Sequence, residues 1–329
     1  MTLIAYSIAH FLTDAVCAGL IFSYPDMIPY ILMYDLLAFS TQPITGILAD
    51  TIQKYRYIAV AGGIITSLGA LIFIPIPMKI CMLGIGNSLF HVGAGAAVLK
   101  GSSLKAAPLG IFVAPGSMGL LLGTLFPSIA IYAAIALALI SVYLIWAKEY
   151  KVKETSETIS IFKHDKKIMA FLIIAIILIS VSVRSLASYS MSFPWKDTLL
   201  LSVIAGIMIM AGKTAGGFIL DKFRSVPVIL TAILIPGPLI AFLSSYAIPS
   251  LIGLFLINCS MPLTLYMLYR MIPDYPGFAF GLAASFLFPG MIAGLGINLN
   301  GFLMFLVFVL NSVLMYIAVI IMKKGSIRI

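Results

Sequence analysis

The chain is poor in charge, cysteine, histidine and tryptophan. Charged residues make up 9% of its 329 residues, and it has three cysteines, three histidines and two tryptophans. The cysteines Cys17, Cys81 and Cys259 all lie inside apolar segments, which excludes a disulfide framework and indicates buried packing. With so few charged groups, the chain cannot cover the surface of a soluble domain of this length.

Apolar residues dominate the composition of the chain. The chain is 62% hydrophobic with a mean hydropathy of +1.16, so lipid is its expected solvent. The net charge of +9 does not indicate nucleic-acid binding, because the basic residues lie in short loops between apolar runs and not on one polar face. The first apolar run lacks a basic leader and a cleavage site, and we interpret it as a retained span.

A bilayer-crossing helix needs about 20 mostly apolar residues. On this measure the sequence predicts an all-α integral membrane protein with twelve transmembrane helices. The predicted spans are 2–22, 28–50, 57–75, 79–99, 107–125, 128–147, 168–189, 198–220, 226–244, 248–270, 277–296 and 300–322.

One long polar stretch divides these spans into six and six. We therefore predict an N-terminal bundle over 1–147, a cytoplasmic linker over 148–167, and a C-terminal bundle with a short tail over 168–329. With both termini in the cytoplasm, all but four of the twenty Lys and Arg residues fall on the cytoplasmic side. This bias is the positive-inside rule, and it supports both the span count and the orientation. We expect the protein in the cytoplasmic membrane.

The two halves also repeat each other. Gly46-Ile-Leu-Ala-Asp50 recurs about half a chain length later as Gly217-Phe-Ile-Leu-Asp221, and Pro115-Gly116 recurs at nearly the same offset as Pro289-Gly290. Each motif that ends in Asp is followed by basic residues, which are Lys54 and Arg56 in the first copy and Lys222 and Arg224 in the second. A duplication of this kind is typical of membrane transporters.

Twelve spans in two pseudo-symmetric halves, with this Gly-x-x-x-Asp motif after the second and eighth spans, resemble the major facilitator superfamily. The resemblance implies that Asp50 and Asp221 cap helices and pair with basic groups across the interface between bundles, latching one conformation. Gln53 stands where the family usually has a turn glycine, which we expect to loosen the first latch. The latch residues implied in this way are Gly46, Asp50, Lys54, Arg56, Gly217, Asp221, Lys222 and Arg224.

The N-terminal half is more closely similar to the fosmidomycin-resistance branch of drug exporters. The resembling segments are Ala9-His10-Phe-Leu-Thr-Asp14, Gln42-Pro43-Ile-Thr-Gly46 and Gly84-Ile-Gly86-Asn-Ser-Leu-Phe90-His91. The superfamily implies alternating access, proton coupling and a monomer, and the branch implies export of a small, anionic compound.

His10 and Asp14 are the first candidates for chemistry, because ionisable residues inside spans are costly and need a reason to be there. They lie one helical turn apart, so the histidine could hold or relay a proton for the carboxylate. The alternative is a structural polar pair that fixes helix packing.

Arg184 in the seventh span lies at about the repeat equivalent of Asp14. In the superfamily these two helices face each other across a central cavity. We hypothesise that Arg184 binds an anionic group of the substrate when protonation of Asp14 releases it. The alternatives are a fixed ion pair, or a side chain that reaches the membrane surface.

Four further residues are candidates for substrate binding, and each has a structural alternative. His91 could instead bond a backbone carbonyl, Asp35 could be a second proton site or could reach outer water, and Lys213 could extend to the cytoplasmic surface. Tyr189, beside Arg184, is a possible hydrogen-bond donor.

Two other classes of function are alternatives. His10, Asp14 and Cys17 share a helix face and could bind a transition metal, which would make the protein a metal transporter. The second alternative is a membrane protein that does not transport, either an enzyme or a scaffold. The sequence has no hydrolase triad, phosphate loop or cofactor fingerprint, which argues against an enzyme, and its short loops argue against a scaffold. The favoured hypothesis is a cofactor-free, proton-coupled exporter of a small organic solute, embedded in lipid and without nucleic-acid partners.

Overall fold

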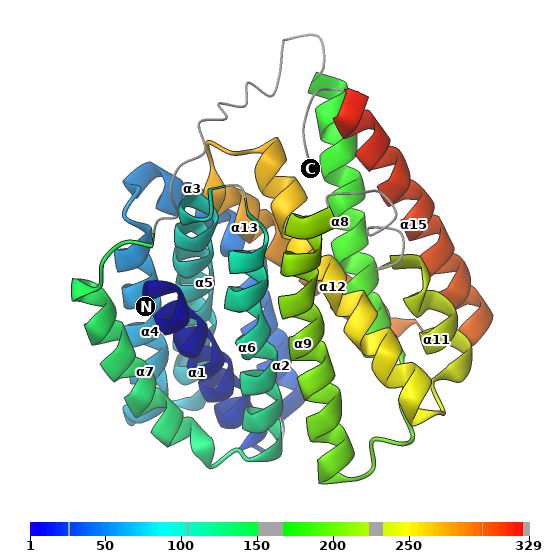
Figure 1. Cartoon of the computed structure of the whole chain (residues 1–329). Coiled ribbons are helices and arrows are strands. Elements are labelled where there is room, and N and C mark those ends of the chain that lie inside the picture. Colours follow the sequence, from blue (N-terminus) through cyan, green and yellow to red (C-terminus); the bar gives the residue numbers. More distant parts are fainter. Residues whose placement is uncertain (26, 104, 151–166, 224–232, 298, 325–329) are drawn as a thin grey trace. The chain divides into compact units, whose positions relative to one another are not determined.

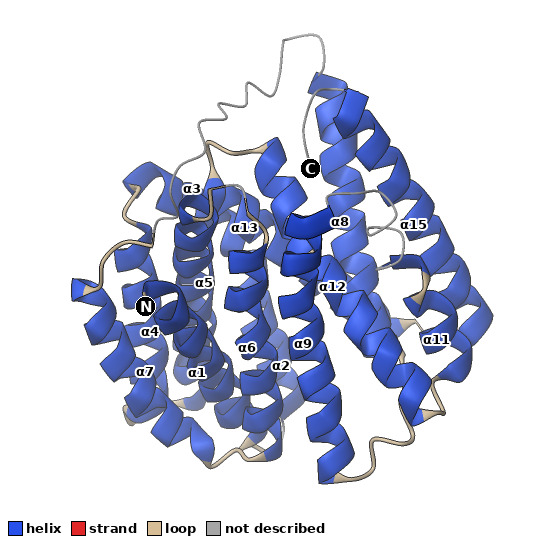
Figure 2. Ribbon diagram, in the orientation of Figure 1, coloured by secondary structure: helices blue, strands red, loops and turns tan. Residues whose placement is uncertain are grey.

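A computed structural model describes the chain except residues 26, 104, 151–166, 224–232, 298 and 325–329. Every element among the described residues is helical (Figures 1 and 2). The helices up to residue 146 are α1 (Thr2–Phe22), α2 (Met27–Asp35), the π-helix η1 (Leu36–Ser40), α3 (Gln42–Ile52), α4 (Tyr55–Leu71), α5 (Ile76–Gly101), α6 (Ala107–Leu125) and α7 (Ile129–Trp146). Those that follow are α8 (Lys167–Ser190), α9 (Leu199–Phe223), α11 (Pro236–Leu243), α12 (Ala247–Met271), α13 (Pro276–Ser285), α14 (Leu287–Gly296) and α15 (Gly301–Lys324).

Ten of the described helices or helix runs are long and apolar enough to cross a membrane, as expected for a multi-pass membrane protein. Two of these are composite: α2, η1 and α3 form one run over Met27–Ile52, and α13 and α14 form another over Pro276–Gly296. The third predicted span, 57–75, corresponds to the 17-residue helix α4, which ends at Leu71 before extended Ile72. Of the ninth, 226–244, residues 226–232 lie outside the described residues and α11 covers 236–243.

The chain forms two compact units. Unit 1 comprises Met1–Ser103, Ile111–Val152 and Asp274–Ser285, and unit 2 comprises Leu104–Gly110, Lys153–Pro273 and Phe286–Ile329. Each unit thus contains a short segment from the other half of the sequence. In unit 1, α13 packs on α3 and α5. Most of the predicted linker 148–167 lies outside the described residues.

The second span changes its winding at mid-length. After Asp35 the backbone forms the π-helix η1 before α-helical geometry resumes at Gln42. Helix α5 packs closely here, because a Cβ atom at Gly84 would lie 2.6 Å from the Cβ of Leu37. Short π-helical segments occur frequently at functional sites.

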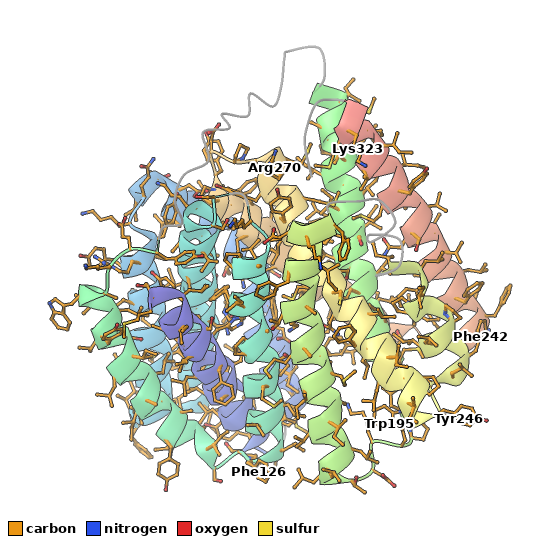
Figure 3. All side chains as sticks on the ribbon, viewed as in Figure 1. Phe126, Trp195, Phe242, Tyr246, Arg270 and Lys323 are labelled. Atoms are coloured by element: carbon orange, nitrogen blue, oxygen red, sulfur yellow. The ribbon has the colours of Figure 1, made fainter. Side chains whose placement is uncertain are left out.

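The two ends of unit 2 differ in chemistry. Trp195 and Tyr246 lie at one end, whereas Arg270 and Lys323 lie at the other (Figure 3). Tyr246 is exposed, as is Phe242 near the same end. Aromatic side chains favour membrane–water interfaces, and basic ones favour the cytoplasmic side. The orientation was predicted from the same basic residues and stays a prediction.

Candidate functional site

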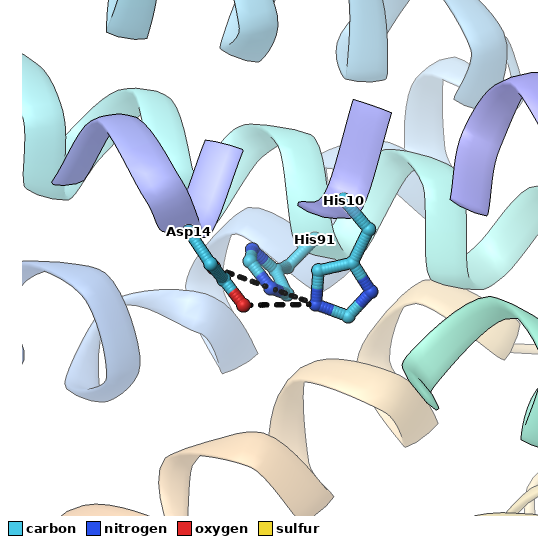
Figure 4. Close-up of side chains that lie close together, drawn as sticks. All are labelled: His10, Asp14 and His91. Carbon is cyan, nitrogen blue, oxygen red and sulfur yellow. Dashed lines mark hydrogen bonds and ion pairs between the residues drawn. The ribbon is translucent and has the colours of Figure 1, made fainter. Parts of the chain in front are cut away.

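Helix α1 carries the first two residues of a polar cluster in unit 1. His10 Nε2 lies 3.3 Å from Asp14 Oδ2, as expected for side chains one turn apart on a helix (Figure 4). The His10 side chain is buried, with the ring of Phe112 from α6 centred 4.8 Å away. Asp14 is half-buried, so the cluster keeps limited access to solvent.

His91 from α5 completes the cluster, although it is 81 residues away from His10 in sequence. Its Nε2 atom lies 3.6 Å from Asp14 Oδ1 and 2.8 Å from Nε2 of His10. The two imidazole planes are nearly perpendicular, at 88°. Both histidines therefore lie within ion-pair distance of the Asp14 carboxylate.

The second nitrogen of each ring is held by the backbone. His10 Nδ1 lies 2.8 Å from the carbonyl oxygen of Phe112, and His91 Nδ1 lies 3.0 Å from that of Asn87. A carbonyl oxygen only accepts hydrogen bonds, so Nδ1 carries the proton in both rings. The structural alternative predicted for His91 from the sequence is a bond to a backbone carbonyl. That bond is present, and His91 also pairs with Asp14.

Helix α6 leaves room for the cluster by presenting a glycine. A Cβ atom on Gly116 would lie 2.3 Å from His10 Nε2 and 2.5 Å from Asp14 Oδ2. The Pro115-Gly116 motif, which is part of the repeat, thus faces the ionisable groups directly.

Cys17 does not join this cluster as the metal hypothesis requires. The donor atoms of His10, Asp14 and His91 lie within 4.8 Å of one another, and these are the residues that could hold a metal ion among the described ones. The Cys17 thiol instead faces the side-chain amide of Asn87, at 4.0 Å, and the hydroxyl of Tyr34. The same Asn87 amide lies 3.4 Å from Asp14 Oδ1.

Asp35 is a second buried carboxyl group in unit 1. It is 6% exposed, at the junction of α2 and η1, and it forms no hydrogen bond or ion pair with any described residue. Burial of an unpaired carboxylate costs several kcal/mol, so protonation is one way to accommodate it. Asp35 therefore stays a candidate for proton or substrate binding.

Arg184 occupies a small cavity in unit 2. The side chain is buried, and its Nη1 donates long hydrogen bonds to Ser260 Oγ at 3.5 Å and Thr264 Oγ1 at 3.4 Å, both from α12. Asn311 from α15 lines the same cavity, and its buried side-chain oxygen lacks a hydrogen-bond partner. No carboxylate among the described residues pairs with Arg184.

Two further predicted residues, Lys213 and Tyr189, belong to unit 2. Lys213 is half-buried on α9, and Tyr189 is exposed near the end of α8. Sequence reasoning missed Arg270, which the span prediction places at the cytoplasmic end of a helix. Arg270 is 3% exposed, donates to Tyr266 Oη at 3.3 Å, and has a buried Nε with no partner.

Asp50 binds the start of a helix from the other half of the chain. Its two carboxylate oxygens accept hydrogen bonds from the backbone N–H groups of Gly277 and Phe278, both at 2.8 Å, and Tyr55 donates a third at 3.0 Å. Close approach requires Gly46, because a Cβ there would lie 2.5 Å from the carbonyl oxygen of Gly277. A carboxylate at a helix N-terminus is stabilised by the free N–H groups and the helix dipole.

Asp221 repeats this arrangement within unit 2. It accepts hydrogen bonds from Ala106 N at 2.7 Å and Ala107 N at 3.0 Å, where α6 begins. Ala106 and Ala107 precede Gly277 and Phe278 by the same sequence offset that separates Asp50 from Asp221. The repeat therefore includes the residues that each aspartate binds. Asp50 precedes its partners along the chain, whereas Asp221 follows its own.

The basic residues of the motif do not pair with these carboxylates among the described residues. Arg56 donates to the carbonyl oxygen of Ala147 and stacks over Tyr57, and Lys222 lies over the ring of Phe223. Lys54 is exposed, and Arg224 lies outside the described residues. Gln53 ends α3 with φ of 55°, the left-handed conformation that favours glycine.

No protein-family model and no curated protein matches this sequence. Solved structures do match. The chain is 14% identical to the major facilitator transporter FucP in its outward conformation, with a TM-score of 0.62 and 97% of each chain covered. A second FucP structure, described as the E. coli fucose:proton symporter, is 14% identical with a TM-score of 0.63. The match covers 96% of this chain and 95% of that one.

The human organic anion transporter MFSD10 gives 14% identity and a TM-score of 0.67, over 97% of this chain and 98% of that one. At 14% identity, the similarity to these structures shows a shared fold alone. The chain therefore has the fold of major facilitator transporters.

Proposed function

We propose that the protein is a secondary transporter that moves a small organic anion across the cytoplasmic membrane by alternating access, coupled to protons. The observation that carries the proposal is the separation of two buried sites: a carboxylate with two imidazoles in unit 1, and an arginine without a carboxylate partner among the described residues of unit 2. The first suits proton binding and the second suits an anion.

The N-terminal site supports proton coupling. Imidazole changes charge between about pH 5 and pH 8, and both rings of the cluster lie against the Asp14 carboxylate. Intramembrane carboxylates and histidines of this kind commonly form proton relays. One protein with this fold is described as a fucose:proton symporter, which is consistent with such coupling.

The C-terminal site supports an anionic substrate. Arginine presents a planar set of donors that matches carboxylate and phosphate groups. Around Arg184, hydroxyl groups from Ser260 and Thr264 and the unpartnered amide oxygen of Asn311 offer further hydrogen bonds. One protein with this fold is described as an organic anion transporter.

The repeat supports a two-part mechanism. Helices α5 and α12 begin at Ile76 and Ala247, which are separated by the same offset as Asp50 and Asp221. His91 and the Arg184 partners on α12 therefore come from corresponding helices of the two halves. We propose that proton binding in one half and anion binding in the other alternate during transport. Export is the proposed direction, on the resemblance of the N-terminal half to drug exporters.

The two aspartates are the proposed latches of this cycle. Each binds the N-terminus of a helix in the other half of the sequence, and the proposed cycle breaks and re-forms these hydrogen bonds. A pair of such contacts related by the repeat would hold one conformation until ligand or proton binding favours the other.

Thermal stabilisation of the purified protein by a ligand panel tests the substrate class. The panel contains mono- and dicarboxylates, phosphonates, lipophilic cations, neutral sugars and divalent metals, each measured at about pH 5.5 and about pH 7.5. A ligand that binds the folded state raises the melting temperature. We expect stabilisation by an anion that disappears in Arg184→Ala. Stabilisation by a transition metal alone, lost in His10→Ala, would replace the proposal by metal transport.

A further inference from the structure

The two imidazoles of the cluster turn their Nε2 atoms toward each other. Both Nδ1 atoms carry protons, since each faces a backbone carbonyl oxygen. If both rings were neutral, the two Nε2 lone pairs would face each other at 2.8 Å, which is repulsive. Moving one proton to Nε2 as a tautomer would place an Nδ1 lone pair against a carbonyl oxygen instead. One additional proton between the Nε2 atoms removes this repulsion and keeps both Nδ1 contacts with the backbone.

We infer that His10 and His91 together hold one proton between their Nε2 atoms, with Asp14 as its counter-ion. The separation of 2.8 Å is that of an ordinary N–H···N hydrogen bond. The carboxylate oxygens of Asp14, at 3.3 and 3.6 Å from the two Nε2 atoms, balance the single positive charge. His91 is thereby assigned to proton binding and not to the substrate.

The spacing favours a proton over a tetrahedral metal ion. Two imidazole nitrogens bound tetrahedrally at the usual zinc distance stand about 3.3 Å apart. The observed separation is shorter. The other titratable groups near the cluster are Cys17 on α1 and Tyr34 and Asp35 on α2, whereas α6 contributes the carbonyl of Phe112 and the backbone of Gly116.

Loss of the shared proton changes the contact between helices. Without it the two lone pairs repel each other and Asp14 faces no positive charge from either ring. His10 lies on α1 and His91 on α5, so deprotonation favours separation of these two helices at this point. This step rests on the proposed function, because it supplies the link between proton release and conformational change, whereas the shared proton itself does not depend on transport.

Nitrogen NMR of protein labelled with ¹⁵N-histidine tests the shared proton without any transport. The chain has three histidines, and His164 in the linker serves as the reference ring. At about pH 7 we expect both cluster rings protonated at Nδ1, with one proton shared by their Nε2 atoms. Asp14→Asn, which removes the counter-ion, should abolish the signal of the shared proton, and His164→Gln should leave the cluster signals unchanged.

Two results would overturn the inference. One is a pair of neutral rings at about pH 7, and the other is a stoichiometric transition metal in protein purified without a histidine tag. A transport measurement separates the two proposals. If anion-driven proton movement persists in His91→Gln, the coupling role of the shared proton fails while the transporter function stands. If the shared proton is observed but no anion drives proton movement, the function fails while the site stands.

Discussion

At the scale of single residues, the molecule places unusual demands on a few positions. Gly116 borders the polar cluster so closely that no side chain fits, and Gln53 adopts a backbone conformation that suits glycine. Both positions lie in motifs related to the repeat, but substitution should have opposite effects on stability at the two. The first is already the best residue for its place, and the second is not.

Gly116→Ala should disrupt the proton site. The added methyl group would lie 2.3 Å from His10 Nε2, so the ring or the helix must move. Overpacking of this kind typically costs about 1–3 kcal/mol. We expect a lower melting temperature and loss of anion-driven proton movement. Gly296→Ala is the matched control, since a Cβ there meets nothing within 4 Å, and an equal effect from both variants would contradict this explanation.

Gln53→Gly should stabilise the protein. The left-handed φ of 55° is strained for a residue with a Cβ atom, and the exposed Gln53 side chain forms no hydrogen bond with a described residue. Relief of the strain, less the entropy cost of glycine, predicts a gain of about 0.5–1 kcal/mol. Thermal unfolding measures it. Gln53→Ala keeps the strained φ and should show no gain, so equal stabilisation by both variants would exclude the backbone explanation.

At the scale of helices, each of the two aspartates proposed as latches joins one helix to the first turn of another. Asp50 on α3 is 7% exposed and has three hydrogen-bond donors around it, whereas Asp221 on α9 is half-buried with two. The negative charge and the two oxygen acceptors both matter, because two N–H groups point at the carboxylate in each case. The latches are thus similar in geometry but unequal in burial.

Asp50→Ala should therefore destabilise the protein more than Asp221→Ala. Removing a buried acceptor from charge-assisted bonds costs about 1.5–3 kcal/mol, and in Asp50→Ala it leaves the N–H groups of Gly277 and Phe278 without a partner. Asp50→Asn keeps one oxygen acceptor and should lie between wild type and Asp50→Ala. Differential scanning measurements of melting temperature give the order, and a larger loss for Asp221→Ala would contradict it.

Helix positions were largely predictable from the sequence, whereas contacts between helices were not. The span predicted over 79–99 is α5, Ile76–Gly101, because apolar length determines membrane helices. The π-helix at Leu36–Ser40 and the interruption at Phe286 have no such signal. The closeness of His10 and His91 depends on how α1 and α5 pack across 81 residues, which no local pattern encodes.

At the scale of the whole molecule, the duplicated sequence has diverged in chemistry while keeping its geometry. The capping contacts of Asp50 and Asp221 are related by one constant sequence offset, but Arg184 in unit 2 stands at about the repeat equivalent of Asp14 in unit 1. The repeat and the ionisable residues could be read from the sequence. Only the structure shows that Arg184 forms no ion pair with a described carboxylate.

Arg184 should distinguish substrate binding from folding. In Arg184→Ala we expect anion-driven proton movement to be lost while proton binding at His10 and His91 persists, since these residues belong to different units. Arg184→Lys keeps a charge but not the planar fork, and should retain only part of the activity. Melting temperature serves as the folding control. Full activity in Arg184→Ala would exclude this residue from the substrate site.

The most direct test of the central claim measures proton movement in liposomes that contain the purified protein and an internal pH-sensitive dye. Each organic anion of the panel is added outside, and neutral sugars serve as the control. The account predicts a change of internal pH that depends on an anion and is abolished in Asp14→Asn. An anion-driven change of equal size in Asp14→Asn, or none with any anion in wild type, would contradict it.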